Sequence, residues 1–516
     1  MCALQSASSA SRVELTPVDH LVRSSSVHGA RLAVVDGDLR LTYTELLVSC
    51  EQMAGALIAL GVRPGDRVAV LAPNTSVLLR AHFAVPMAGG VLVALNTRLA
   101  PHELATIVAH SGAVLTIVDE DLLDRAAEIN GRQVTASEFV SLADSSSPMR
   151  LPCPDEMAMI AMNYTSGTTG RPKGVMYHHR GAYLQSLAMA YHAGLGVDTV
   201  YLWTLPMFHC NGWTFPWAVV AAGGVQGCLR KVNPVESWRL IRHEGVNTLC
   251  GAPVVLGDLA RAEQAAPLDV RVNVLTGGSP PSPTLLATME GLGFDVTHLY
   301  GLTETFGPVV VSPWYPEWDQ LPADQRARLK ARQGGPNIVA QPLTVVGQDG
   351  APVPRDSETM GEVLLRGNNI TLGYFADEEQ TSHSYADGWF RTGDLAVWHP
   401  DGMIELRDRA KDIIISGGEN ISSIEVEQVL AAHPNVREVA VVARSHPRWG
   451  EVPVAFVAEQ VAGAASEEAL IEWVRGRLAH YKAPKQVVFT ELPKTSTGKI
   501  EKHALRRHLA EQDHEV

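Results

Sequence analysis

The feature that most constrains the fold is an alternation of helical and strand-like segments that begins near residue 41. TYTELLVSCEQMAGALIALGV has apolar residues at helical spacing and ends at a glycine, and DRVAVLA soon after it has the pattern of a short strand. SVLLRAHFAVPMAGG and ELATIVAHSGA repeat the helical pattern, whereas VLVALN and AVLTIVD repeat the strand pattern. This alternation predicts an α/β fold with a largely parallel sheet covered by helices.

The middle of the chain continues the alternation. The predicted strands are DTVYLWTLP, GGVQGCLR, VNTLCGAP and VRVNVLTGG, and the helices between them include PVESWRLIRHEG and SPTLLATMEGLG. Several of these strands end in Gly, Ser or Pro. Because ligands of open α/β sheets bind at the carboxyl ends of the strands, we expect a ligand crevice there.

The pattern changes after Trp389. GDLAVWHPDGMIELRDRAKDIIISGG indicates short strands with a turn at Asp401–Gly402, and a helix with a capping pattern begins near Ser422. Two strands, a helix and a last strand follow: VREVAVVAR, PVAFVAEQ, SEEALIEWVRGRLAH and QVVFTEL. Since 516 residues exceed one ordinary core, we predict a large N-terminal domain of helix-covered sheets, residues 1–410, and a small α+β C-terminal domain, residues 411–516.

The charge and the cysteines exclude several classes of protein. A net charge of −14 with dispersed Lys and Arg argues against nucleic-acid partners and acidic membranes. No apolar run reaches membrane-spanning length, and the N-terminus lacks the charged start and apolar run of a secretion signal. The 6 cysteines form no C-x-x-C pair, which favours neither a zinc site nor a disulfide framework. We expect a cytoplasmic protein without membrane insertion.

The run YTSGTTGRPKGV at residues 164–175 combines groups that suit a polyphosphate. Its glycines allow close backbone approach, and its side chains supply hydroxyl groups and one positive charge. These side chains are Thr165, Ser166, Thr168, Thr169 and Lys173. The spacing does not fit the P-loop pattern. A flexible surface loop is the alternative, but the strand-like MAMIAMNY before it would aim this loop from a sheet.

Three later segments complete a family pattern. HLYGLTETFGP at 298–308, GWFRTGDLAVWHPDGMIELRDRAKDIIISGGENISSIEVE at 388–427 and LPKTSTGKI at 492–500 follow the loop in order. Together with the loop, they resemble the signatures of the adenylate-forming superfamily of acyl-CoA synthetases, peptide-synthetase adenylation domains and luciferases. The resemblance runs from about Thr16 to the C-terminus. It implies that a carboxylate attacks ATP to give acyl-AMP and pyrophosphate, and that a thiol then attacks the acyl-AMP.

The resemblance also assigns roles around the nucleotide. Glu304 matches the carboxylate linked to Mg²⁺, with Thr303 beside the α-phosphate, and Asp394 matches the acceptor of the ribose hydroxyls. Arg409 matches a second ribose or phosphate contact. The other residues that match nucleotide contacts are Thr165, Ser166, Gly167, Thr168, Thr169, Lys173, Gly277, Gly278, Tyr300, Gly301 and Lys499. Taken singly, Glu304 and Asp394 would be ordinary turn residues.

The family's small C-terminal domain is mobile, and three parts of this chain match that behaviour. Lys499 matches the lysine that reaches the α-phosphate and the carboxylate during adenylation, and Lys411 aligns with the hinge. Gly417, Gly418 and Glu419 match the face that guides the thiol after rotation. A solvated lysine and a plain turn are the simpler interpretations.

The acyl pocket is expected at LPMFHCNGWTFPW, residues 205–217, with His209 and Trp213 nearest the carboxylate and Gly277 and Gly301 opposite. Ordinary core packing is the alternative for most of these aromatic residues. The motifs look closest to the short- and medium-chain branch that includes methylmercaptopropionate-CoA ligases and plant acyl-activating enzymes. We therefore expect a small, medium or aryl carboxylic acid, with Lys499, Glu304, Thr165, Lys173 and His209 as the catalytic residues.

The acceptor stays open between two enzyme classes. The first is a carboxylate–CoA ligase that uses ATP, Mg²⁺ and CoA. The second is a ligase with a non-thiol acceptor, such as a nitrite-using diazotase of aryl amines. A non-catalytic nucleotide-binding protein is disfavoured because the matching residues are all present, and a homodimer is left open.

Overall fold

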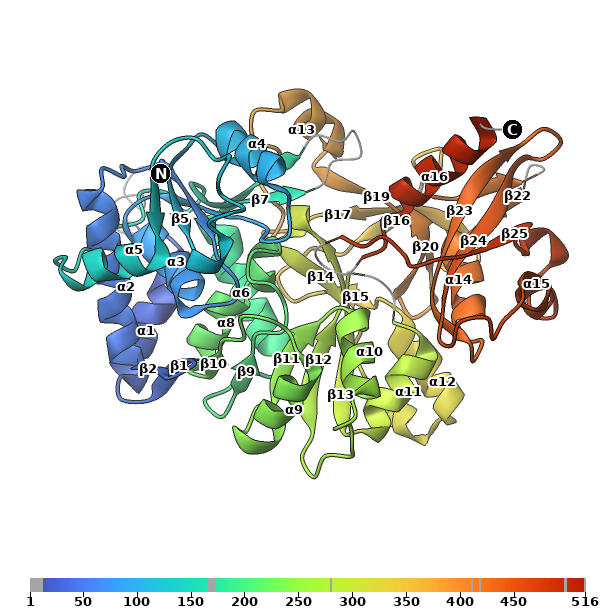
Figure 1. Cartoon of the computed structure of the whole chain (residues 1–516), viewed down its shortest axis with the longest axis horizontal. Coiled ribbons are helices and arrows are strands. Elements are labelled where there is room, and N and C mark those ends of the chain that lie inside the picture. Colours follow the sequence, from blue (N-terminus) through green and yellow to red (C-terminus); the bar gives the residue numbers. More distant parts are fainter. Residues whose placement is uncertain are drawn as a thin grey trace, which may run out of the picture.

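The computed structural model describes residues 13–165, 172–278, 281–409, 412–416, 419–495 and 499–514. A large part built from the first four-fifths of the chain carries a smaller C-terminal part at one end (Figure 1). The large part contains three sheets and the small part contains one.

A nine-stranded sheet with the order β15-β14-β13-β12-β11-β9-β10-β1-β2 organises the middle of the chain. All neighbours from β13 to β1 are parallel, which confirms the predicted parallel sheet, and the antiparallel pairs lie at the two edges. Its strands are β1 (Leu32–Asp36), β2 (Leu39–Thr42), β9 (Val200–Leu202), β10 (Val225–Gly227), β11 (Thr248–Gly251), β12 (Val272–Thr276), β13 (Phe294–Leu302), β14 (Gly307–Val311) and β15 (Gly335–Pro336).

A six-stranded sheet with the order β6-β5-β3-β4-β7-β8 lies beside it and is parallel except for its last pair. Its strands are β3 (Arg67–Leu71), β4 (Val91–Ala94), β5 (Ala113–Val118), β6 (Gln133–Thr135), β7 (Met159–Thr165) and β8 (Lys173–His178). The largest apolar core joins residues of both sheets, such as Val34, Val68 and Tyr201, to the helices packed on them. These sheets thus share one interior.

Helices cover the two parallel sheets, as the sequence predicted. Thr42 caps the longest of them, because its hydroxyl accepts the amide of Glu45 while the Glu45 carboxylate accepts the amide of Thr42. The helices of this part are α1 (Val18–His28), α2 (Tyr43–Ala59), α3 (Ser76–Met87), α4 (Pro101–Ser111), α5 (Ala136–Asp144), α6 (His179–His192), α8 (Phe215–Ala222), α9 (Pro234–His243), α10 (Pro253–Arg261), α11 (Pro283–Gly291) and α12 (Ala323–Ala331).

A third, antiparallel sheet follows, and part of it precedes the change of pattern at Trp389. It contains β16 (Thr344–Val346), β17 (Met360–Leu365), β18 (Tyr385–Ala386), β19 (Trp389–Trp398) and β20 (Ile404–Arg409), with α13 (Glu378–Ser384) beside it. Gly402 has φ +86°, as the predicted turn between β19 and β20 requires. This sheet carries Asp394 and Arg409.

The C-terminal part has a mixed sheet and its own apolar cores. Its elements are β21 (Ile414–Ser416), β22 (Glu419–Ile421), α14 (Ser423–Ala431), β23 (Val436–His446), β24 (Gly450–Glu459), α15 (Glu467–Arg475), β25 (Gln486–Phe489) and α16 (Lys502–His514). Ser422 caps α14 by accepting the amide of Glu425, in agreement with the predicted pattern. No helix within the described ranges is long and apolar enough to cross a membrane.

Candidate active site

The phosphate-loop segment is framed by two paired strands. β7 and β8 run antiparallel, and Thr165 lies opposite Lys173. The prediction of one continuous loop over 164–175 was therefore wrong at both ends, because backbone pairing extends β7 to Thr165 and starts β8 at Lys173. Ser166, Gly167, Thr168 and Thr169 lie outside the described residues.

Lys173 is joined to Glu304 through a tyrosine that the sequence analysis missed. The Lys173 Nζ lies 5.2 Å from the centre of the Tyr374 ring, and the Tyr374 hydroxyl donates to Glu304 Oε1 at 2.7 Å. A backbone bridge between Val175 and Tyr374 holds the ring against β8. The contact brings a cation and a carboxylate from distant segments to one place.

Glu304 lies in a short 3₁₀ helix, Thr303–Thr305, directly after β13. Burial of the carboxyl among protein atoms raises the pKa of Glu304, while the hydrogen bond from Tyr374 acts in the opposite direction. Among the described residues, no three His, Cys, Asp or Glu side chains form a metal-binding group. Proteins usually hold Mg²⁺ with one or two carboxylates together with substrate phosphates, and Glu304 offers one carboxylate.

Two of the predicted nucleotide-side residues contact a third, Asp394. The Tyr300 hydroxyl donates to Asp394 Oδ2 at 2.7 Å, and the Arg409 Nε lies 3.1 Å from Asp394 Oδ1. Asp394 and Arg409 are opposite each other on β19 and β20. The negative charge of Asp394 is the main cause that raises the pKa of Arg409. The three side chains thus form one polar unit from β13 and two strands of the third sheet.

Two glycines allow close backbone approach beside this unit. A Cβ atom on Gly301 would lie 1.9 Å from the carbonyl oxygen of Gly307, and one on Gly277 would lie 2.8 Å from that of Leu299. Gly277 and Gly278 directly follow β12, at the carboxyl end of a parallel strand. A larger residue in place of Gly301 or Gly277 would displace the backbone that lines the site.

The predicted acyl wall has an unusual backbone. Residues 210–214 all have positive φ, between 40° and 65°, and α7 (Cys210–Trp213) lies within this left-handed run. Such a conformation costs about 1–2 kcal/mol per non-glycine residue, so other contacts must hold it. Asn163 does so, because its Oδ1 accepts the Asn211 amide at 3.0 Å and its Nδ2 donates to Asn211 Oδ1.

The left-handed run places Trp213 against glycines. The end of its indole would lie 3.3 Å from a Cβ atom on Gly277, and its backbone and ring would lie 3.0 to 3.3 Å from one on Gly307. The sequence analysis placed Trp213, Gly277 and Gly301 in one pocket. The first two are neighbours in the structure, and Gly301 packs on Gly307 beside them.

His209 and Lys499 interact electrostatically, although they are far apart in the sequence. Burial lowers the pKa of His209 to about 4, and the positive charge of Lys499 acts in the same direction. The charge of Lys499, in the C-terminal part, thus acts on a residue of the predicted acyl wall. Lys411, Gly417 and Gly418 lie outside the described residues, whereas Glu419 begins β22 and is exposed.

Besides Tyr374, the sequence analysis missed two side chains that support Thr303. The Tyr177 hydroxyl donates to the Thr303 carbonyl oxygen at 2.8 Å, and the Cys210 Sγ lies 3.4 Å from the Thr303 Oγ1. Burial raises the pKa of the Cys210 thiol to about 12, so the sulfur stays protonated. A lone tyrosine or cysteine carries no spacing signal that could have identified it.

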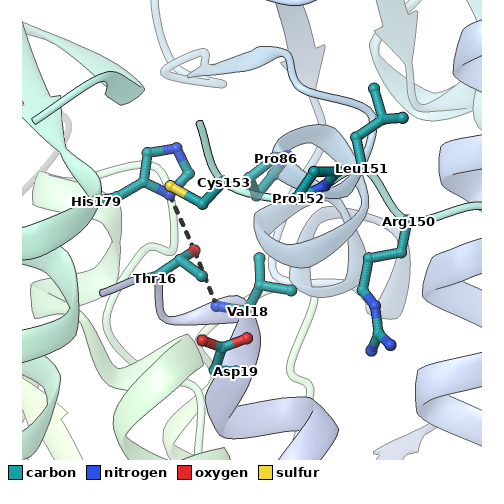
Figure 2. Close-up of a pocket in the computed structure, with 9 residues that line it drawn as sticks. All are labelled: Thr16, Val18, Asp19, Pro86, Arg150, Leu151, Pro152, Cys153 and His179. Atoms are coloured by element: carbon teal, nitrogen blue, oxygen red, sulfur yellow. Dashed lines mark hydrogen bonds between the residues drawn. The ribbon is translucent and has the colours of Figure 1, made fainter. Parts of the chain in front are cut away.

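Cavities elsewhere do not contain these residues. One of about 210 Å³ lies between the N-terminal segment and residues 150–153, with Thr16, Asp19, Arg150 and His179 in its wall (Figure 2). Another of about 410 Å³ lies near Arg80 and Arg230. Neither brings together the residues singled out by the sequence.

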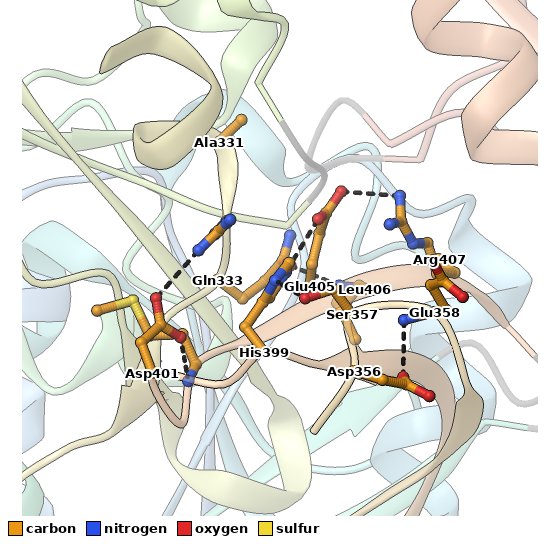
Figure 3. A network of polar contacts seen from close by, with 12 residues as sticks. Ala331, Gln333, Asp356, Ser357, Glu358, His399, Asp401, Glu405, Leu406 and Arg407 are labelled. Carbon is orange, nitrogen blue, oxygen red and sulfur yellow. Dashed lines mark hydrogen bonds and ion pairs between the residues drawn. The ribbon is translucent and has the colours of Figure 1, made fainter. Parts of the chain in front are cut away.

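A Ser–His–Glu cluster at the third sheet resembles a hydrolytic triad but lacks its other parts (Figure 3). The Ser357 Oγ lies 2.9 Å from His399 Nδ1, and His399 Nε2 lies 3.1 Å from Glu405 Oε2. The two backbone amides after Ser357 donate to Asp356, so they are not available to an oxyanion. We therefore assign this cluster a structural role at the turn between β19 and β20.

The fold and the site define an enzyme that activates a carboxylic acid with a nucleotide. Residues 21–375 match the family model described as AMP-binding enzyme, and residues 425–499 match the AMP-binding enzyme C-terminal domain. The chain belongs to the AMP-binding enzyme family, among its AMP-forming acyl-CoA ligases.

Relatives and solved structures agree with this membership. The chain is 43% identical to a 2-methylpropanoate–CoA ligase of Humulus lupulus, over 96% of this chain and 95% of the relative. It is 41% identical to a peroxisomal acetate/butyrate–CoA ligase of Arabidopsis thaliana, over 96% and 95% of the two chains. The o-succinylbenzoate CoA synthetase of Bacillus subtilis, solved with its acyl-adenylate intermediate, superposes with a TM-score of 0.83 at 28% identity, over 95% of this chain and 97% of that chain.

Proposed function

We propose that the protein joins a small, medium or aryl carboxylic acid to CoA through an acyl-AMP intermediate, with ATP as the source of the adenylate. The observation that carries this proposal is the polar unit in which Asp394 accepts from Tyr300 and pairs with Arg409. The effect of the Lys499 charge on buried His209 supports a role for this lysine where the acid and the α-phosphate would meet.

In the first half of the reaction, a carboxylate oxygen of the acid attacks the α-phosphorus of ATP. The bond to the β-phosphate bridging oxygen breaks, and pyrophosphate leaves. Glu304 is the residue that would hold Mg²⁺, and the ion would supply positive charge to the phosphates. Lys499, Lys173 and Thr165 stabilise the charge that develops at the transferred group, because preorganised cations and donors act most strongly in a site with little water.

The nucleotide is oriented by the polar unit of the third sheet. The Asp394 carboxylate accepts hydrogen bonds from the ribose hydroxyls. Arg409 holds that carboxylate in place and adds a ribose or phosphate contact. Tyr300 and the backbone at Gly277 and Gly278 flank the adenine. Rigid placement of this kind lowers the entropic part of the barrier.

In the second half, the thiol sulfur of CoA attacks the acyl carbon, the thiol proton is lost and AMP leaves. We assign residues 1–410 to the adenylation domain and 411–516 to a mobile domain that turns about Lys411. This division is supported by the sheets, because β20 pairs within the third sheet and β21 pairs within the C-terminal sheet. Gly417, Gly418 and Glu419 would then face the thiol.

The acid is the less defined part of the proposal. The similar proteins act on 2-methylpropanoate, on acetate or butyrate and on o-succinylbenzoate, which supports a range from short to aryl acids. Neutral His209 and the Trp213 indole would lie at the carboxylate end. A cytoplasmic location and a homodimer belong to the proposal too, although one relative is peroxisomal.

One assay separates CoA from a non-thiol acceptor. Enzyme, ATP and Mg²⁺ are incubated with short, branched and aryl acids, with CoA, with nitrite or with neither, and the products are measured by mass spectrometry. The proposal expects AMP and acyl-CoA to appear together only with CoA. AMP release driven by nitrite, with no thioester, would favour the diazotase instead.

A further inference from the structure

A cluster of buried charges joins the segment that carries Lys499 to the strand that carries Arg409. The Lys502 Nζ, at the start of α16, lies 2.7 Å from Glu427 Oε1 and 2.5 Å from the Ser423 hydroxyl. The amide of Ser423 in turn donates to Asp408 Oδ2 at 2.6 Å. Asp408 is the residue before Arg409 on β20, so the contacts cross from the C-terminal part to the third sheet.

The charged groups of the cluster interact strongly with one another. Burial alone would lower the pKa of Lys502, but the carboxylates of Glu427 and Asp408 outweigh it, and the pKa is raised. Only 17% of the Lys502 side chain is exposed, and Ser423 is fully buried. Buried ion pairs add little to stability over apolar side chains of the same size, whereas they do require one defined geometry. The cluster is therefore better suited to fixing an orientation than to holding a core.

Both ends of the cluster reach residues of the site. Lys499 stands three positions before Lys502, and the segment between them is tied back to the chain. A backbone β-bridge joins Lys494 to Ile500, and the Thr495 amide donates a hydrogen bond to the Lys499 carbonyl oxygen at 2.7 Å. At the other end, Arg409 holds Asp394. A shift of Lys502 would thus move Lys499 relative to the nucleotide side.

We propose that Lys502 is a positioning residue for acyl-AMP formation: through Ser423, Glu427 and Asp408 it fixes the start of α16 so that Lys499 faces His209. This inference rests on the proposed function, because it concerns the same reaction. Lys502 itself does not touch the reacting groups. It acts on the half of the reaction that uses Lys499 and leaves the thiol step unaffected.

The chain offers a matched control, a second lysine that pairs with a glutamate of α14. Lys482 makes a two-point ion pair with Glu425 of α14, at 2.7 and 2.9 Å, and both partners belong to the C-terminal part. Lys482→Met removes a lysine that pairs with α14, without breaking a contact to Asp408. It measures how much a lost ion pair in this domain matters by itself.

The test compares Lys502→Met, Lys502→Arg and Lys482→Met in the full chain. Acid-dependent exchange of pyrophosphate into ATP reports acyl-AMP formation, and supplied acyl-AMP with CoA reports the thiol step. Lys502→Met is expected to lower exchange at least about tenfold, as a misplaced catalytic group does, with the thiol step within about twofold. Lys502→Arg is expected to recover most of the exchange, and Lys482→Met to change neither rate.

Two results would overturn the positioning role. One is a wild-type rate of exchange in Lys502→Met, and the other is an equal loss in both half-reactions together with a lowered melting temperature. If Lys502→Met does not fold, Ser423→Ala replaces it, since it removes only the hydroxyl that Lys502 contacts, and a selective loss of exchange is again expected. Absence of exchange in the wild-type enzyme would instead overturn the proposed function, and the inference with it.

Discussion

The nucleotide side of the site and the segment that carries Lys499 are held in different ways. Tyr300, Asp394 and Arg409 bond to one another from three regular strands. By contrast, the backbone of Lys499 bonds to Thr495 within its own segment, and the charge of Lys499 acts on the pKa of His209. One half of the site is built into the sheets, and under the proposal the other half comes from the C-terminal part.

The two halves of the site therefore suit different tasks. Groups that bind the nucleotide throughout the reaction gain from a fixed frame, because their geometry is set before the substrate arrives. A group needed in one half-reaction can come from a part that moves. The predictions below test this contrast, beginning with the fixed side.

The largest expected effect is that of Glu304→Gln. The amide keeps the size of the side chain but removes the negative charge proposed to hold Mg²⁺, and acyl-AMP formation is expected to fall about 10²- to 10³-fold. Pyrophosphate exchange at varied Mg²⁺ measures the loss. A loss of less than about threefold at every Mg²⁺ concentration would remove Glu304 from the metal site.

Tyr374→Phe is expected to have a smaller effect on the same group. It deletes the 2.7 Å hydrogen bond to Glu304, a bond to a charged group worth about 1.5 kcal/mol, so exchange should fall about tenfold. Tyr385→Phe is the control, because the hydroxyl lost there contacts the uncharged Thr371 at 2.7 Å. Equal rates in the two variants would mean that Tyr374 does not orient Glu304.

The last expected effect concerns stability in acid and not the rate of the reaction. Burial is the main cause that lowers the pKa of five histidines to about 4, all of them in the large part: His20, His82, His179, His209 and His298. The unfolded chain takes up these protons near pH 6.5, so the folded state loses stability as the pH falls from about 6.5 to 4, by up to about 3 kcal/mol per histidine.

Hydrogen exchange at pH 7 and pH 5 would follow this loss segment by segment. The strands of the two parallel sheets are expected to lose protection at pH 5, and His82→Gln should reduce the difference between the two pH values. If the C-terminal part loses protection first, the acid sensitivity does not come from these histidines.

The regular elements could be predicted because their local pattern agrees with their packing. The helix at 43–59 has apolar residues at helical spacing, and the strand at 67–71 is a short apolar run that is buried almost throughout. The turn at Gly402 and the cap at Ser422 were also predicted correctly, since each depends on a short local signal. The third sheet was recognised only from Trp389 onward, because β16 and β17 are short and their pairing is long-range.

The site was predictable where residue type and spacing carry the chemistry, and not where tertiary pairing does. Tyr374 reaches Glu304 only because its segment bridges to Val175 across nearly two hundred residues. The left-handed run after His209 depends on Asn163, which lies on β7 and is distant in the sequence. The roles assigned to Lys411, Gly417 and Gly418 stay predictions.

The most direct test of the account is Lys499→Ala measured in both half-reactions. A cation that acts only while the acid attacks ATP predicts a loss of acyl-AMP formation of about 10²-fold or more, with thioester formation from supplied acyl-AMP and CoA within about twofold of the wild type. An equal loss in both assays would contradict the account, because Lys499 would then serve the whole reaction and not the half to which its domain brings it.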